Sequence, residues 1–337
     1  QDTSFESWLS RRTVAEQDAN LGVGRAKLWR DGKISFRDLM DANGRELSLE
    51  ELRTITNTAQ NKAAGGIKPQ VLNAYNSAPA SVINAINLAP RLKSLTQTRG
   101  ESGAFYASKS SKIEMGDKGV RPEGSESYNR ILRHEFGHHV DYAGSSSARS
   151  VKFIDDLELD GAELNKSRTR YLRGDADRSG PDLDLARKTV DGYNSDARRA
   201  ARRGDYRGQA QRVIEENIPE ISFKDLTSIY GDINYEEALD FQAAWKARDV
   251  SYLLDKNVSD GSLLVGLQDT FGASLKGRVG MKFNHSEKYY ADRGSQGQTT
   301  EAFANWFDVV GSGNPAASAL YKHLFPRTFK AIEELIK

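Results

Sequence analysis

Apolar residues recur at intervals of three and four along most of the chain, which is the spacing of amphipathic helices. Near the start, Phe5, Trp8 and Leu9 fall on one helical face, and Gly22 ends the pattern. Residues 1–62 therefore indicate a short helical N-terminal segment. The stretch "NTAQNKAAGGIKPQ", rich in Ala, Gly and Asn, reads as a linker after it.

Between residues 91 and 116 the apolar positions come in short extended runs instead. Gly and Ser separate these runs, which is typical of a small sheet. Helical spacing precedes the runs and returns after them in the stretch "RILRHEFGHHVDYAG". The predicted elements are helices at 69–77 and 79–88, strands in "RLKSLTQT", "GAFYAS" and "SKIEMG", and a helix from Ser125 or Ser127 to Asp141.

The rest of the chain is again helical in pattern. Residues 145 to about 255 are rich in charged side chains, whereas the last part is compact and apolar. It ends in an amphipathic helix with Phe329, Ile332 and Leu335 on one face. The sequence thus predicts an α+β protein that is mostly helical, with one small sheet.

Composition narrows the possible functions. With 337 residues the chain can form one large domain or two ordinary ones. A formal net charge of +1 gives no overall field that would favour nucleic acid or membrane. The chain has no cysteine, so disulfides, thiolate ligands and thiol nucleophiles are excluded, and any metal must be held by His and carboxylates.

Two further features concern partners and location. Residues 166–212 carry more basic than acidic side chains. A solvated helical face is the favoured interpretation, and contact with nucleic acid or an acidic partner is the alternative. No apolar run approaches the roughly 20 residues of a membrane span. The first residues lack a signal-peptide core and an initiator Met, so we expect the chain to be excised from a longer one.

The histidine-rich stretch carries the clearest chemistry. His134 and His138 are four residues apart, so on a helix they lie on one face and can bind one Zn²⁺. Glu135 emerges beside them and is placed to act as general base in an H-E-x-x-H arrangement. The alternative is a helix with incidental histidines. The position after a predicted strand and inside a helical pattern favours the metal site, with His139 facing away.

A catalytic zinc site needs a third protein ligand. Asp141, one turn beyond His138, is one candidate, although we favour for it a hydrogen bond to an imidazole. The preferred candidate is Glu301 in "QTTEAFANWFD", where Thr299 or Thr300 is expected to cap a helix that has Glu301 in its first turn. On that helix Phe303, Trp306 and Phe307 are expected to be buried, and Asn305 to lie beside Glu301 and orient a ligand.

Peptide hydrolysis also needs a donor for the developing oxyanion. The stretch "FNHSEKYYADRG" offers His285, Tyr289 and Tyr290 shortly before Glu301. Tyr290 and His285 are the leading choices, and simple packing of these aromatic side chains is the alternative.

"HEFGHHVDYAG" together with "TEAFANWF" resembles the gluzincin metallopeptidases, in particular the anthrax lethal factor-like catalytic domains. The resemblance implies a zincin-like peptidase domain over residues 66–337, with the charged helical stretch at about 145–255 as an insertion. It further implies that an edge strand, "GAFYAS" or "SKIEMG", aligns the substrate. The implied residues are zinc ligands His134, His138 and Glu301, the base Glu135, and Tyr289 or Tyr290 at the oxyanion.

The first sixty residues resemble a different family. The run "GRAKLWRDGKIS…GRELSLEEL" is similar to the C-terminal end of Mu-like phage minor head proteins, the head-morphogenesis family. This implies a phage virion or the bacterial host cytoplasm as the setting, with phage head or portal proteins as possible partners.

Taken together, these features predict a zinc-dependent endopeptidase of protein or peptide substrates, associated with a phage or prophage head protein. A structural minor capsid component whose zinc serves folding alone is one alternative. A protease effector delivered to a competitor or host cell is the other.

Overall fold

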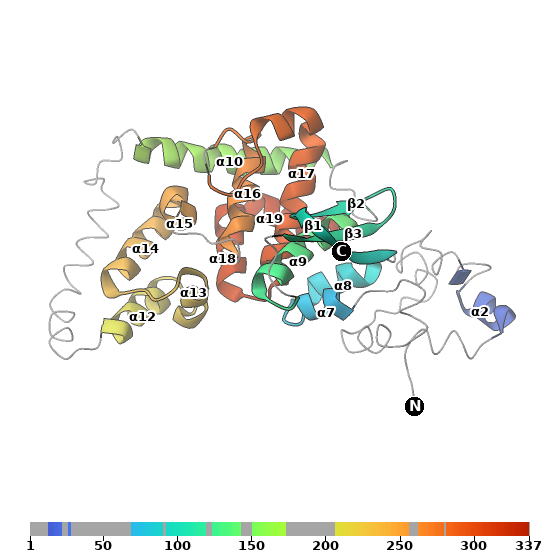
Figure 1. Ribbon diagram of the computed structural model, residues 1–337. Coiled ribbons are helices and arrows are strands. Elements are labelled where there is room, and N and C mark those ends of the chain that lie inside the picture. The colour runs from blue at the N-terminus through green and yellow to red at the C-terminus, as the bar shows by residue number, and fades with distance from the viewer. Residues whose placement is uncertain are drawn as a thin grey trace. The chain divides into compact units, whose positions relative to one another are not determined.

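The computed structural model describes residues 13–21, 26–27, 69–89, 92–118, 123–142, 150–172, 206–255, 262–279 and 281–336. Of the predicted N-terminal segment, only helix α2 (Val14–Leu21) and residues 26–27 fall in this range, so the phage-like run lies mostly outside it. Residues 173–205, which make up most of the basic stretch at 166–212, also lie outside it. Within the described ranges the protein is mostly helical with one three-stranded sheet, as predicted (Figure 1).

Contacts divide the chain into two compact units. Unit 1 comprises residues 1–154, 293–313 and 330–337, and unit 2 comprises residues 155–292 and 314–329. Most of the stretch expected as an insertion, 145 to about 255, thus falls in unit 2. No described helix combines the length and the apolar character needed to cross a membrane.

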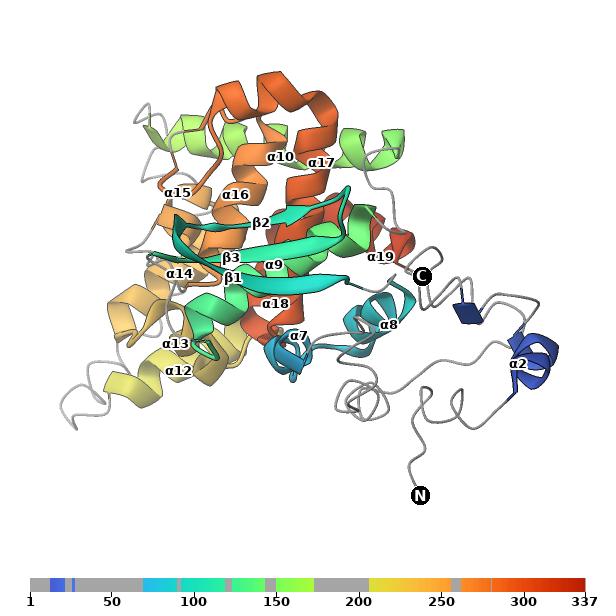
Figure 2. The ribbon, with the colours of Figure 1, turned by 45° about the vertical axis from the view of Figure 1, so that its right-hand side comes forward.

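The sheet belongs to unit 1 and follows two short helices, α7 (Pro69–Ala74) and α8 (Ala80–Leu88). Its strands are β1 (Ser94–Ser102), β2 (Ala104–Ala107) and β3 (Lys112–Lys118). β3 lies between the other two, parallel to β1 and antiparallel to β2 (Figure 2). Of the two candidate edge strands, "GAFYAS" therefore forms an edge of the described sheet, whereas "SKIEMG" forms its centre.

One face of the sheet is covered by helix α9 (Glu126–Val140), which carries the histidines. Ser125 caps this helix by accepting a hydrogen bond from the backbone N–H of Tyr128, so the earlier of the two predicted starts is confirmed. Along β3, Ile113 and Met115 alternate with the more exposed Glu114, and their side chains are buried. This alternation gives the sheet the apolar face on which α9 packs.

The second functional helix, α17 (Glu287–Gly311), begins earlier than predicted and contains a kink at Gly294, where φ is 60°. Thr299 and Thr300 therefore lie inside the helix, and neither caps it as expected. The Thr299 hydroxyl donates to the backbone carbonyls of Ser295 and Gln296, each at 3.2 Å. These bonds run back into the turn that precedes Thr299, which shows that the helix already continues before it, so the predicted cap was wrong.

The expected apolar face of α17 is confirmed, since Phe303, Trp306 and Phe307 are fully buried. Buried aromatic pairs continue from Phe307 to Tyr75 and from Tyr75 to Phe136 on α9. The chain closes with α19 (Pro326–Leu335), on which Phe329 and Ile332 are buried as predicted.

All regular secondary structure in the described part of unit 2 is helical. Its helices are the greater part of α10 (Val151–Leu172), then α12 (Tyr206–Asn217), α13 (Phe223–Tyr230), α14 (Tyr235–Ala247), α15 (Val250–Asp255), α16 (Leu264–Ser274) and α18 (Pro315–Leu324). Asp160 of α10 is fully buried there and accepts hydrogen bonds from Thr328 and Arg327 at the start of α19.

Candidate metal centre

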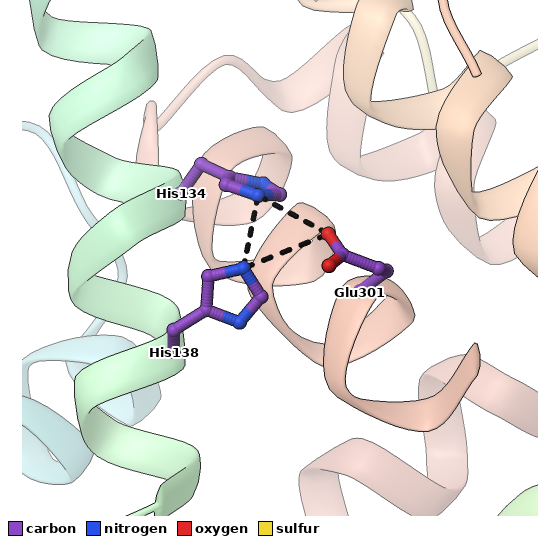
Figure 3. Close-up of side chains that lie close together, drawn as sticks. All are labelled: His134, His138 and Glu301. Carbon is purple, nitrogen blue, oxygen red and sulfur yellow. Dashed lines mark hydrogen bonds and ion pairs between the residues drawn. The ribbon is translucent and has the colours of Figure 1, made fainter. Parts of the chain in front are cut away.

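Two side chains of α9 and one of α17 converge on a single point in unit 1 (Figure 3). His134 Nε2 and His138 Nε2 lie 3.1 Å apart. Glu301 Oε2 lies 3.3 Å from His134 Nε2 and 3.6 Å from His138 Nε2. The two helices thus bring together the three side chains that the sequence predicted as metal ligands, and this cluster can hold a metal ion.

These distances fit a tetrahedral ion of the size of zinc. Ligand atoms bonded to tetrahedral Zn²⁺ at about 2.0–2.1 Å lie about 3.3 Å from one another. The three measured separations, 3.1, 3.3 and 3.6 Å, bracket that value. Calcium and magnesium prefer oxygen ligands, so a site with two imidazole nitrogens disfavours both.

Asn305 orients one of the two imidazoles. Its Oδ1 lies 3.0 Å from His134 Nδ1, a contact that favours a proton on Nδ1 and leaves Nε2 to face the centre. Asn305 thus contacts one of the two predicted imidazole ligands, as its predicted position on the helix requires. His138 Nδ1, in contrast, is buried with no hydrogen-bond partner among the described residues, so Asp141 does not provide the bond expected of it there.

Glu135 has the setting expected of a general base. It is 7% exposed and follows His134 directly on the helix. In the described part of the chain its carboxylate makes no hydrogen bond or ion pair that would compete for a proton. A carboxylate that is little hydrated and uncommitted can accept a proton from a neighbouring water.

The charge of Glu301 depends on what faces it. Burial raises the pKa of this carboxyl, but the two facing imidazoles outweigh burial and hold the pKa well below its usual value. Glu301 is 2% exposed, so an anion at this position needs nearby positive charge. Two imidazolium groups or a metal dication both provide such charge.

A second cluster of charges fixes the two helices in register. Arg133 Nε donates to Asp308 Oδ1 at 3.3 Å and to the Asp308 carbonyl at 3.1 Å, and Arg130 Nη1 lies 3.4 Å from Asp308 Oδ2. Burial raises the pKa of Asp308, and the two arginines lower it in part. Arg133 on α9 pairs with Asp308 on α17, whereas His138, further along α9, faces Glu301, which comes earlier on α17. The two helices therefore run antiparallel.

The sequence prediction missed this cluster, although a signal for it was present. Asp308 lies seven residues after Glu301 and Arg130 four before His134, so each shares a helical face with a ligand. Opposite charges that each share a helical face with one half of a site are a usable sign that the two helices pair.

Gly137 lets the two helices approach closely. A Cβ atom at this position would lie 2.8 Å from the Ala304 Cα and 2.9 Å from the Phe307 Cβ. Contacts this short do not occur in proteins, so any larger residue would push α17 away from α9. The glycine inside the motif is therefore a condition for Glu301 to reach the histidines.

The predicted oxyanion donors lie in unit 2, so their role at this centre stays a prediction. His285 is held by Asp269, which accepts from its backbone N–H and faces its Nδ1, both at 2.9 Å. Its ring packs against Tyr289, with centroids 4.1 Å apart. Tyr290 is buried at 2% exposure and contacts the rings of His285 and Tyr289.

Comparison with protein-family models, with curated proteins and with solved structures finds no match to this chain. The assignment of function therefore depends on the geometry of the centre itself.

Proposed function

We propose that this protein is a zinc-dependent endopeptidase with a zincin fold of the gluzincin type. The observation that carries the proposal is the cluster of His134 Nε2, His138 Nε2 and Glu301 Oε2, with 3.1 to 3.6 Å between these atoms. Three ligands leave one position of a tetrahedral zinc ion open, which is the mark of a catalytic site and not of a structural one.

Bound zinc would lower the pKa of a water molecule to near 7 and polarise a substrate carbonyl. Glu135 would act as the general base, accepting a proton from the attacking water and donating it to the leaving amine. Asn305 keeps His134 in the tautomer that presents Nε2. The Arg133–Asp308 pairs hold the two helices in the register that this chemistry requires.

A peptide substrate fits the sheet beside the centre. β2 is paired on one side only within the described sheet, and it packs on α9, the helix that bears His134, Glu135 and His138. An unpaired strand edge offers backbone donors and acceptors to an extended peptide. The phage or prophage setting is part of the proposal and rests only on the resemblance of the run "GRAKLWRDGKIS…GRELSLEEL" to phage minor head proteins.

Glu135→Gln tests the proposal. We expect the variant to retain zinc, measured by elemental analysis, and to lose about 10²–10⁴-fold in cleavage of unfolded protein, the usual contribution of a general base. Glu123→Gln, an exposed carboxylate just before α9, is the control and should cleave as the unchanged chain does. A folded protein that binds no zinc, or equal cleavage by both variants, would disprove the proposal.

A further inference from the structure

One polar contact links the sheet edge to the metal-binding helix. The Tyr106 hydroxyl on β2 lies 3.1 Å from Nδ1 of His139 on α9. The two rings also meet edge to face, with centroids 5.3 Å apart and planes at 67°. His139 has no solvent exposure, although it is one of the most polar side chains on the helix.

Strand geometry explains why Tyr106 and not its neighbour makes this contact. Tyr106 is paired across the sheet with the buried Ile113, so both face α9. Phe105 is paired with Glu114 on the opposite face and is 55% exposed. The side chain that carries a hydroxyl is thus the one turned toward the helix.

The same phenol also contacts the turn between β2 and β3. Burial raises the pKa of Tyr106, and the nearby Ser111 side chain lowers it in part. Ser111 adopts a φ of 50°, in the left-handed region that non-glycine residues rarely occupy. Tyr106 therefore joins three elements, namely the edge strand, its turn and α9.

Packing alone does not account for this arrangement. An apolar pair of similar size would fill the same space without the cost of burying an imidazole and a phenol. Polar contacts in a core fix relative positions, because they require a particular distance and direction. His139 directly follows the ligand His138, so the contact fixes β2 relative to the metal centre itself.

We propose that Tyr106 and His139 form a latch that holds the edge strand β2 at a fixed position beside the metal centre, and that Tyr106 is a positioning residue for an extended peptide. This inference deepens the proposed endopeptidase function and rests on it. β2 has four residues and is paired on one side only in the described sheet, so it needs a further contact to keep its position.

Tyr106→Phe tests the latch by removing one oxygen atom. Fluorescein-labelled β-casein, an unfolded protein, serves as the probe. The parent protein is the zinc-loaded chain with Glu135→Gln, so that the casein is not cleaved during the binding measurement. We expect Tyr106→Phe to weaken binding about 10-fold, as expected for loss of a buried hydrogen bond. Tyr142→Phe is the matched control, because the Tyr142 ring centroid lies 5.9 Å from that of Tyr106 while the hydroxyl that meets His139 belongs to Tyr106. This control should bind as the parent does.

In the chain with Glu135 intact, we expect Tyr106→Phe to raise KM by the same factor and to leave kcat within about 2-fold, because binding along β2 is equal in ground and transition states. Zinc content should not change. A lower kcat with reduced zinc would show a role in folding the metal site and would overturn the latch.

The remaining outcomes are also decisive. Equal binding by Tyr106→Phe and its parent overturns the latch and leaves the endopeptidase proposal intact. If the parent binds casein but the unchanged chain does not cleave it, the endopeptidase proposal is contradicted. The comparison of Tyr106→Phe with Tyr142→Phe then still tests the latch. A parent that binds no casein overturns the latch, since β2 then holds no peptide.

Discussion

Asp160 in unit 2 and Glu301 in unit 1 are buried carboxylates that each lie where two helices meet, and the two differ in their partners. In unit 2, Asp160 accepts from the backbone N–H and the hydroxyl of Thr328, both at 2.9 Å, and from Arg327 at 2.9 Å. In unit 1, Glu301 faces two imidazole nitrogens at 3.3 and 3.6 Å. Both side chains are almost fully buried.

The comparison shows that burial of a charge is not by itself a sign of function. Groups of the chain itself donate hydrogen bonds to both carboxylate oxygens of Asp160. Burial nevertheless raises the pKa of Asp160 more than these bonds lower it. Around Glu301 the opposite holds, since its neighbours hold its pKa well below the usual value. Imidazoles are metal ligands, whereas a backbone N–H and a guanidinium are not, so the partner type separates a metal site from a structural lock.

Glu301→Gln should have the largest effect on zinc affinity. If it had none, the distinction between Glu301 as a metal ligand and Asp160 as a structural residue would fail. An amide is a weaker zinc ligand than a carboxylate, so we expect zinc affinity to fall by more than the roughly 10–100-fold loss typical of outer partners. Isothermal titration with Zn²⁺ measures this. Zinc should raise the melting temperature of the unchanged chain but not of this variant. Unaltered affinity would show that Glu301 is not a ligand.

Asp160→Ala should lower the stability of the fold and leave zinc affinity unchanged. Thr328 loses its acceptor at the start of α19, so we expect the free energy of unfolding to fall by about 2–3 kcal/mol. The loss stays below that of a fully buried ion pair because Arg327 reaches solvent. Zinc affinity should not change. The exposed Asp155, on the same helix, gives the control Asp155→Ala, and equal effects of both would show that the buried position carries nothing special.

Gly137→Ala tests whether the close approach of α9 and α17 is what places Glu301 beside the histidines. The added Cβ meets the backbone of Ala304, so α17 must move, and we expect a loss of about 2 kcal/mol in the free energy of unfolding together with weaker zinc binding. Chemical unfolding and zinc titration measure the two effects. Loss of stability without any loss of zinc affinity would mean that the helix spacing does not place Glu301.

Asn305→Ala should have the smallest effect. His134 loses the acceptor that fixes its tautomer, so we expect zinc affinity to fall about 10-fold, at the low end for such partners. Asn305→Asp keeps an acceptor at this position and should bind zinc at least as well as the unchanged chain. Equal affinities for Asn305→Ala and the unchanged chain would remove Asn305 from the centre.

The parts of the fold that the sequence predicted are those that local spacing determines. His134 and His138 could be paired because four residues make one helical turn, and Asn305 could be placed beside Glu301 by the same rule. The extended runs around "GAFYAS" and "SKIEMG" gave the strands, and Ser125 gave the start of α9. Each of these depends on residues within one or two turns.

What could not be predicted depends on contacts between distant segments. Strand order is one example, since nothing in the sequence says that β3 lies between β1 and β2. The contact between Tyr106 and His139 is another, because a tyrosine in a short strand has no signature of its partner. Thr299 was wrongly predicted as a cap because a threonine there is compatible with both a helix start and a helix interior. The helix instead starts before Thr299, where the kink at Gly294 lies.

The two halves of the metal centre are far apart along the chain, and 171 positions separate His134 from Asn305. Closing such a loop costs conformational entropy that grows only with the logarithm of its length, about 0.6 kcal/mol for each doubling. The chain between α9 and α17 can therefore gain or lose whole helices at little cost to the centre. Other proteins that share it are best sought by two short patterns, H-E-x-x-H and E-x-x-x-N-x-x-D, with any number of residues in between.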